Sequence, residues 1–276
     1  MTDDEVVHAV QALVAAGEYL DDIPGVPGAR LSGAGSFEGN RRLYRRGSPE
    51  HLEARAAGLV DRLPPLTPAS PAAVQEAEGL LGHRLPWLLR RLYLEVGNGG
   101  FGPGYGILGV RGGHPETPGD DYHHTAVDLY RQARSGSLTK WRSMPAALLP
   151  VCYWGCGIYS LIDCADPQAT MWAWDPNPAP HDDIGKALFP QSMTFGEWLV
   201  RWIDRRLHQP ALVQDPDTGS GEAPPIRSTR HGARSWRGCD VDSGLLIPLI
   251  KPHASHFNPR NPSVSMERPA VEGMTA

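Results

Sequence analysis

The 276-residue chain has little cysteine and no long apolar run. Its four cysteines, Cys152, Cys156, Cys164 and Cys239, are too few for the disulfide framework of a secreted scaffold. No segment approaches the roughly 20 consecutive apolar residues that a membrane-spanning helix needs. The acidic N-terminus, Met1–Glu5, is not typical of a signal peptide. We therefore expect a cytoplasmic protein with no membrane partner.

Positive charge is also scarce. Lysine and arginine number 26 against 31 aspartate and glutamate residues, which gives a net charge of −5. Nucleic-acid binding depends on a concentrated basic face. The only tight basic cluster, Arg42, Arg45 and Arg46, is interpreted as a short solvated run. These counts predict no nucleic-acid partner.

Signatures of catalysis are missing as well. The chain contains no Gly-x-Ser-x-Gly elbow, no His-Glu-x-x-His and no Walker pattern. Residues 104–109 satisfy the dinucleotide-binding glycine pattern, but that pattern binds pyrophosphate only between a strand and a helix. Here a helix is predicted before the glycines, and the glycines and prolines of residues 112–119 exclude one after them. We expect no catalytic residue and no cofactor, although a spatially paired cysteine and histidine stays open.

A pair of helices is the clearest feature that is present. Ser70-Pro71 is a typical helix start, with a capping hydroxyl before a first-turn proline. Apolar residues at helical spacing follow it, and Gly82 favours a left-handed stop. A second helix is predicted over residues 85–96, then a tight turn over 97–100 and a short strand over 105–110.

The N-terminal 64 residues predict a helical extension. Residues 3–18 have the periodicity of an amphipathic helix, and residues 21–47 are expected to be irregular. Ser48-Pro49 repeats the helix-start signature, and Pro64-Pro65 ends that helix. Its expected apolar residues are Leu52, Ala56, Leu59, Val60 and Leu63.

The middle of the chain predicts a helix over 125–134 and three short strands, 148–155, 157–164 and 170–174. Tight turns between the strands indicate an antiparallel meander. A capping box at Thr194–Glu197 begins a last helix, whose expected buried face is Phe195, Trp198, Leu199, Trp202 and Leu207. Helices before and after a group of strands indicate the α+β class.

The remaining residues, 209–276, are rich in Pro, Ser, Gly and Arg and are expected to form a largely irregular, disordered tail. One apolar island, residues 245–250, is a candidate for docking on the domain or on a partner. The predicted domain itself spans residues 65–208.

Three stretches of this domain carry a family resemblance. The first is the helix that opens at Leu85-Pro86 and ends at Gly97-Asn98-Gly99-Gly100. The second is residues 149–157, which include Trp154-Gly155, followed by the strand 158–163. The third is Trp172–Asp175 before the closing helix with Phe195, Trp198 and Leu199. Their order and spacing resemble the SUKH superfamily of SMI/KNR-type domains. Many relatives carry an aspartate where this chain has Tyr153.

The resemblance implies an α+β domain that binds other proteins and has no generally accepted catalytic residues. In bacteria such domains are similar to immunity proteins that neutralise secreted toxins, and in fungi they resemble signalling and cell-wall scaffolds. The leading hypothesis is an immunity protein that occludes a toxin by stoichiometric binding. The alternatives are an intracellular scaffold or regulatory protein and, third, a metal-dependent enzyme.

Candidate partner contacts are acidic or aromatic. A rim of aspartates around the strand ends could steer a basic toxin, and it comprises Asp163, Asp166, Asp175, Asp182 and Asp183. Core packing is favoured for most tryptophans, but an exposed one such as Trp154 would anchor a partner.

Two groups of residues have the chemistry of metal ligands. One is Asp120, Asp121, His123 and His124 with His114 nearby, and the other is Cys152, Cys156 and Cys164. A solvated loop and buried cysteines that pack a sheet are the preferred interpretations, so no metal is expected.

Overall fold

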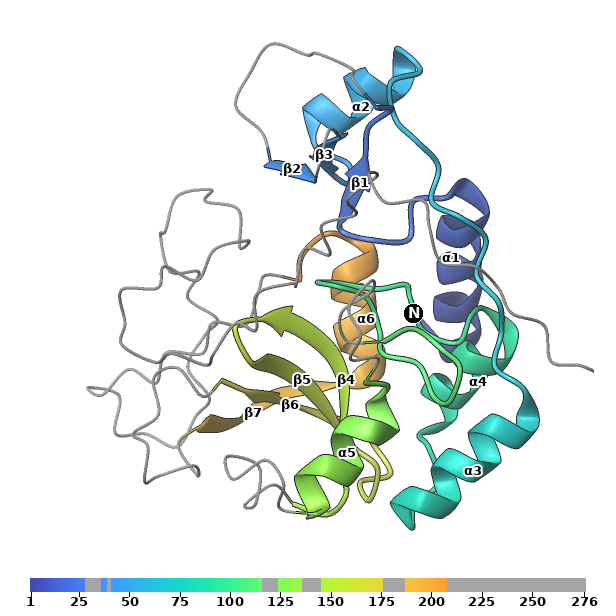
Figure 1. The fold of residues 1–276 in the computed structure, drawn as a ribbon, viewed down its shortest axis with the longest axis vertical. Helices are drawn as coiled ribbons and strands as arrows, with labels where there is room; N and C mark the ends of the chain where they lie inside the picture. The colour runs from blue at the N-terminus through green and yellow to red at the C-terminus, as the bar shows by residue number, and fades with distance from the viewer. Residues whose placement is uncertain (28–35, 39–40, 116–123, 136–144, 176–186, 208–276) are drawn as a thin grey trace, which may run out of the picture. The chain divides into compact units, whose positions relative to one another are not determined.

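The computed structural model describes residues 1–27, 36–38, 41–115, 124–135, 145–175 and 187–207. These residues form six helices, a three-stranded antiparallel sheet and a four-stranded antiparallel sheet (Figure 1). The combination confirms the predicted α+β class. Within these ranges no helix is both long and apolar enough to cross a membrane. The predicted tail lies outside the described residues.

The first 64 residues combine two helices with the smaller sheet. Helices α1 (Asp3–Ala16) and α2 (Pro49–Ala56) flank β1 (Asp22–Pro24), β2 (Ser36–Glu38) and β3 (Arg41–Arg45), which pair in the order β1-β3-β2. The prediction of irregular structure over 21–47 is therefore wrong. Strands of three to five residues are too short to show clear alternation, although Ile23, Leu43 and Tyr44 are buried.

Helix α2 is shorter than predicted and buries a different face. It buries His51 and Ala54, whereas Leu52 is 53% exposed. The helix ends at Ala56, and the chain then pairs with residues 25–26 through a bond from Val26 N to Leu59 O of 2.9 Å. The apolar residues 59–63 thus lie outside the helix to which they were assigned.

Helices α3 (Pro71–Leu81) and α4 (Trp87–Glu95) confirm the predicted pair. Ser70 Oγ accepts a hydrogen bond from Ala73 N at 3.1 Å, and Gly82 ends α3 with a φ of 71°. Leu88, Leu89, Leu92 and Tyr93 form the buried face of α4. The Tyr93 hydroxyl donates to Leu108 O at 2.6 Å and so ties the following loop to the helix.

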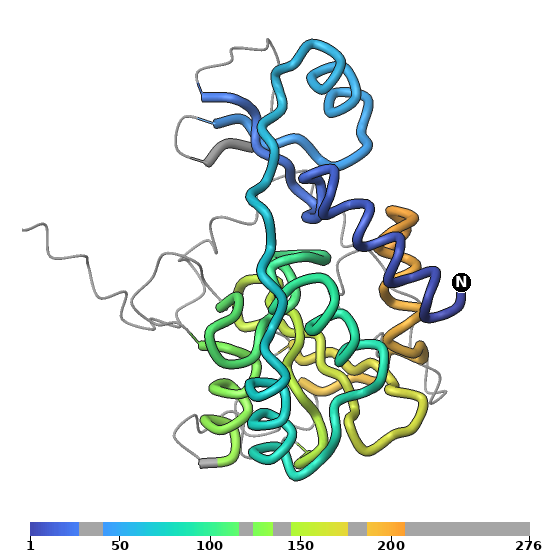
Figure 2. Tube along the Cα trace, turned by 90° about the vertical axis from the view of Figure 1, so that its right-hand side faces the viewer, coloured from blue at the N-terminus to red at the C-terminus, as the bar shows by residue number. Residues whose placement is uncertain are grey.

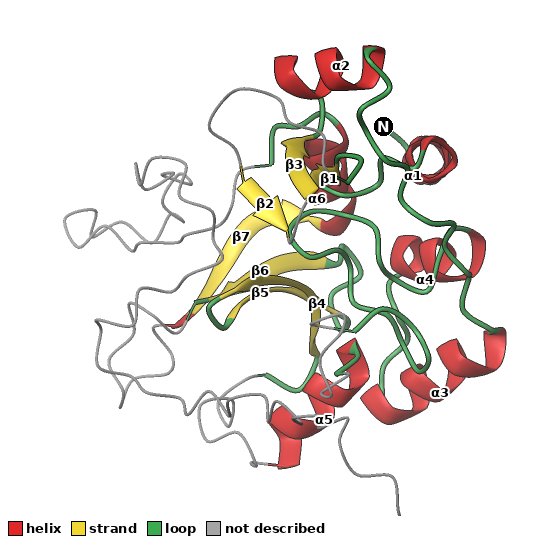
Figure 3. Ribbon diagram, turned by 45° about the horizontal axis from the view of Figure 1, so that its top comes forward, coloured by secondary structure: helices red, strands yellow, loops and turns green. Residues whose placement is uncertain are grey.

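The larger sheet is an antiparallel meander of β4 (Leu148–Gly155), β5 (Ile158–Asp163), β6 (Thr170–Trp174) and β7 (Leu188–Thr194), which lie side by side in that order (Figure 3). The first three strands were predicted and the fourth was missed. Phe189, Gln191 and Met193 are buried at alternate positions along β7, but Pro190 between them obscured the pattern. A proline of this kind is tolerated in a strand at the edge of a sheet.

The strand predicted over 105–110 does not form. Gly104 and Gly106 take φ values of 59° and 94°, which break an extended chain. A single bridge, Ile107 to Cys152, joins this segment to β4, with backbone bonds from Tyr105 N to Tyr153 O and from Leu108 N to Val151 O.

One apolar core extends through α1, α3, α4, α5 (Ala126–Ser135), α6 (Phe195–Ile203) and the larger sheet. The predicted buried face of α6 is confirmed, because Phe195, Trp198, Leu199, Trp202 and Leu207 are all buried. Helix α1 runs beside α6 (Figure 2) and contributes Val6, Val7 and Val10. Residues before and after residue 65 thus share one core.

Candidate functional site

The glycine-rich stretch after α4 holds the loop that forms one wall of the candidate site. Asn98 Oδ1 accepts from Val110 N at 2.9 Å, its Nδ2 donates to Arg111 O at 3.2 Å, and its own carbonyl accepts from His114 N at 2.8 Å. The side chain and carbonyl of this one residue therefore hold residues 110–114 in a fixed loop.

Two glycines make that close approach possible. A Cβ added to Gly99, which has a φ of 77°, would lie 2.6 Å from Gly109 N. A Cβ on Gly113 would clash with the Asn98 side chain. The resemblance singled out Asn98 and Gly99 as fold-defining, and their contacts show how they shape this loop.

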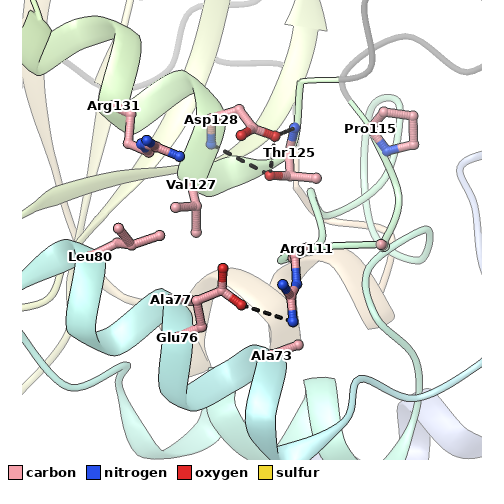
Figure 4. Close-up of a pocket in the computed structure, with 12 residues that line it drawn as sticks. Ala73, Glu76, Ala77, Leu80, Arg111, Pro115, Thr125, Val127, Asp128 and Arg131 are labelled. Atoms are coloured by element: carbon pink, nitrogen blue, oxygen red, sulfur yellow. Dashed lines mark hydrogen bonds and ion pairs between the residues drawn. The ribbon is translucent and has the colours of Figure 1, made fainter.

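The loop closes one end of an open groove between α3 and α5, with a volume of about 530 Å³ (Figure 4). Ala73 and Ala77 from α3 and Val127 from α5 form its buried apolar lining. Leu80 projects into the space from α3 and is 43% exposed. The small alanine side chains leave space in the groove, and the apolar side chain open to solvent there is Leu80.

Charged side chains of both signs frame the groove. Arg111 pairs with Glu76 at 3.0 Å, with side-chain exposures of 70% and 40%. Asp128 Oδ2 accepts from Thr125 N at 3.0 Å and from Thr125 Oγ1 at 2.6 Å, so it caps α5. Arg131 stands on the same helix. Two cations and two anions balance, so the groove has no net charge.

This arrangement suits binding of an apolar side chain. Leu80 offers an apolar surface that water leaves when a ligand is buried, and Val127 lies buried beneath the groove. The exposed pair Glu76–Arg111 is worth little to stability, so a ligand can separate it at small cost. Its donors and acceptors are then available to the ligand backbone.

Two of the predicted partner contacts are buried and not on the surface. Trp154 is 3% exposed, and its Nε1 donates to Ser160 Oγ at 2.9 Å inside the sheet. Asp175 is 5% exposed at the end of β6. These burials correct the expectation that both side chains meet a partner.

Two further aspartates are part of the turn between β5 and β6. Asp163 Oδ1 accepts from Ala165 N at 2.9 Å. Asp166 accepts from Gln168 N at 3.0 Å and from Thr170 N at 3.2 Å. Both carboxylates stabilise the turn and remain partly exposed. Asp182 and Asp183 lie outside the described residues, so Asp163 and Asp166 are the members of the predicted rim that the structure describes at partly exposed positions.

Within the described residues, the cysteines do not form the zinc site that their residue type would allow. Cys152 and Cys164 are free thiols. Burial raises the pKa of Cys152 well above its usual range, and burial with the Asp163 charge raises the pKa of Cys164 to about 12. Both stay protonated near neutral pH, whereas zinc and electrophiles react with thiolates.

The histidine group is only partly described. His114 Nε2 makes a hydrogen bond of 2.8 Å with Tyr105 O, while Asp120, Asp121 and His123 fall outside the described ranges. Among the residues that are described, no three His, Cys, Asp or Glu side chains gather closely enough to hold a metal ion.

Sequence reasoning missed the groove residues Leu80, Arg111 and Arg131. Their proximity depends on how α3 packs against α5, some 50 residues apart in the chain. Ala73 and Ala77 are typical of any buried helix face, so no local signal marked the groove.

Comparison with known proteins identifies the scaffold around the groove. Searches of curated proteins and of solved structures find no match to the chain. Residues 68–201, from the start of α3 into α6, match the family model described as SMI1 / KNR4 family (SUKH-1). The segment 68–201 of this chain is therefore a domain of the SMI1/KNR4 family (SUKH-1), as the sequence resemblance predicted.

Proposed function

We propose that the protein is a non-enzymatic binding module that acts as an immunity protein, occluding a toxin by stoichiometric contact. The observation that supports this proposal most directly is the open, half-apolar groove between α3 and α5 within the SUKH-1 domain. The toxin would insert an apolar side chain between Leu80 and Val127. Because the rim charges balance, shape and apolar contact would select the partner more than long-range attraction.

Co-expression tests the immunity proposal. The full chain is produced together with each toxin candidate encoded beside its gene, and cell survival is measured. Protection against one of them, with a one-to-one complex in solution, is the expected result. Survival no better than without the chain, for every such candidate, would contradict immunity.

The groove itself is tested by a matched pair of leucine variants. Leu80→Glu places a charge in the apolar lining, and Leu52→Glu changes an equally solvent-facing leucine on α2. We expect Leu80→Glu to weaken toxin binding at least tenfold, about 1.4 kcal/mol, and Leu52→Glu to bind as the wild type does. Calorimetric titration measures both affinities.

The outcomes distinguish whether the groove is the binding site from whether the protein is an immunity protein. Equal affinity of Leu80→Glu and the wild type would show that the toxin binds elsewhere on the protein. Chains ending at Leu207 address the scaffold alternative, because immunity through the groove should survive this truncation and recruitment through the tail should not.

A further inference from the structure

A second cavity lies between the end of β3 and the end of α6, and it shares no lining residue with the groove. Its volume is about 390 Å³, which falls within the size of small-molecule sites, roughly 300–1,000 Å³. Arg45, Arg46 and Gly47 form one side of it, and Trp202 and Arg205 form another. Nothing in the proposed toxin binding uses this cavity.

Arg46 is the buried cation of the cavity. It is 8% exposed, its guanidinium lies 4.9 Å from the centre of the Trp202 ring, and Nη2 donates to Trp202 O at 2.9 Å. Its Nε has no hydrogen-bond partner among the described residues. Burial lowers the pKa of Arg46; Asp21 opposes this shift, and Arg205 and Arg45 add to it. The site thus holds a poorly compensated positive charge.

Asp21 is the buried carboxylate of the cavity and is already fully engaged. Its Oδ1 accepts from Trp202 Nε1 at 3.1 Å, and its Oδ2 accepts from Gly104 N at 3.2 Å. Oδ2 also pairs with Arg45 at 3.2 Å. Asp21 therefore offsets Arg45, and the other lining carboxylate, Asp204, pairs with Arg206 at 2.6 Å. Arg46 and Arg205 are left without an ion pair in the described residues.

Arg205 is held over the cavity by an unusual backbone. Its φ of 61° is in the left-handed region, which is costly for a residue with a side chain. Its Nη1 donates to Gly47 O at 2.8 Å. A Cβ on Gly47 would overlap this guanidinium, so the missing side chain of Gly47 makes room for it.

We propose that this cavity binds an oxyanion, the phosphate or carboxylate group of a small molecule, between Arg46 and Arg205. Guanidinium groups present planar pairs of N–H donors that match such oxygens. A bound anion would offset the two cations that the protein leaves without ion pairs. The chain as a whole is acidic, so the site is a local exception to its charge.

Titration of the full chain tests the proposal. Inorganic phosphate and citrate are each added against sodium chloride of equal ionic strength, and binding is followed by calorimetry. Saturable binding of one of them supports the site, and the tighter ligand identifies the group as phosphate or carboxylate.

Matched arginine variants locate the binding. Arg205→Gln removes a cavity cation, and Arg201→Gln removes an exposed arginine of α6 that does not line the cavity. We expect Arg205→Gln to weaken anion binding at least about tenfold and Arg201→Gln to leave it unchanged. Should Arg205→Gln fail to fold, Arg45→Gln, at a side chain 53% exposed, serves instead.

Three results would overturn the proposal. These are no saturable binding of either anion, equal weakening in the Arg205 and Arg201 variants, and full affinity in Arg205→Gln.

Discussion

His51 is a buried titratable residue that neither proposed site uses. It is 1% exposed, and its Nδ1 accepts from Gly47 N at 3.1 Å, so the proton of the neutral ring is on Nε2. That Nε2 has no partner in the described part of the chain. Burial lowers the pKa of His51 below its ordinary value, with Glu18 opposing the shift.

This histidine predicts a loss of stability in mild acid. Below about pH 6.5 the unfolded chain takes up a proton that folded His51 resists, so the unfolding free energy falls as the pH falls. The slope is at most about 1.4 kcal/mol per pH unit for one histidine. Burial lowers the pKa of His114 as well, so it adds in the same direction.

Urea unfolding of the wild type and of His51→Gln between pH 7.5 and 5 measures the effect. Glutamine keeps an acceptor for Gly47 N and does not titrate, so the variant should lose less stability on acidification. Identical pH dependence of the two proteins would show that His51 contributes nothing to it.

Gly99 and Gly79 show that the place of a glycine within its element decides its role. Gly99 has a φ of 77° and no room for a side chain, whereas Gly79 lies within α3 with no atom within 4 Å of an added Cβ. Gly99→Ala should lower the unfolding free energy by more than about 2 kcal/mol. Gly79→Ala should raise it by roughly 0.5–1 kcal/mol, because alanine favours a helix.

Thermal unfolding of the two alanine variants checks both signs in one experiment. A Gly99→Ala protein as stable as the wild type would mean that the loop held by Asn98 can relax at little cost.

Elements with a local signal were predicted, and those defined by distant partners were not. Ser70, Gly82 and the Thr194–Glu197 capping box mark helix ends within a few residues, and the structure has those ends. The strands β1–β3 exist because they pair with one another, and β7 because it pairs with β6. The groove depends on the packing of α3 against α5, which no local pattern encodes. Trp154 was misplaced because a strand pattern does not reveal what covers each face.

At the scale of the whole molecule, α1 shares the core of the family domain although it precedes the matched segment. Val10 is fully buried in that core. Val10→Ala should lower stability by about 2 kcal/mol and shift a single unfolding transition, recorded alike by tryptophan fluorescence and far-ultraviolet circular dichroism. Two separate transitions, with only one moved, would show that residues 1–64 unfold independently.

The two outer strands of the larger sheet bear on how this molecule can meet another. The glycine-rich loop bonds to β4 through Tyr105 and Leu108, and Pro190 leaves β7 one N–H donor short. Exposed strand edges invite added strands and lead to aggregation. Because both edges are protected in this way, the sheet is a poor template for an added strand. A binding partner is then expected to contact side chains and not the sheet edge. Under the proposed binding function, a toxin would escape the protein by changing single side-chain contacts while its backbone path stays the same.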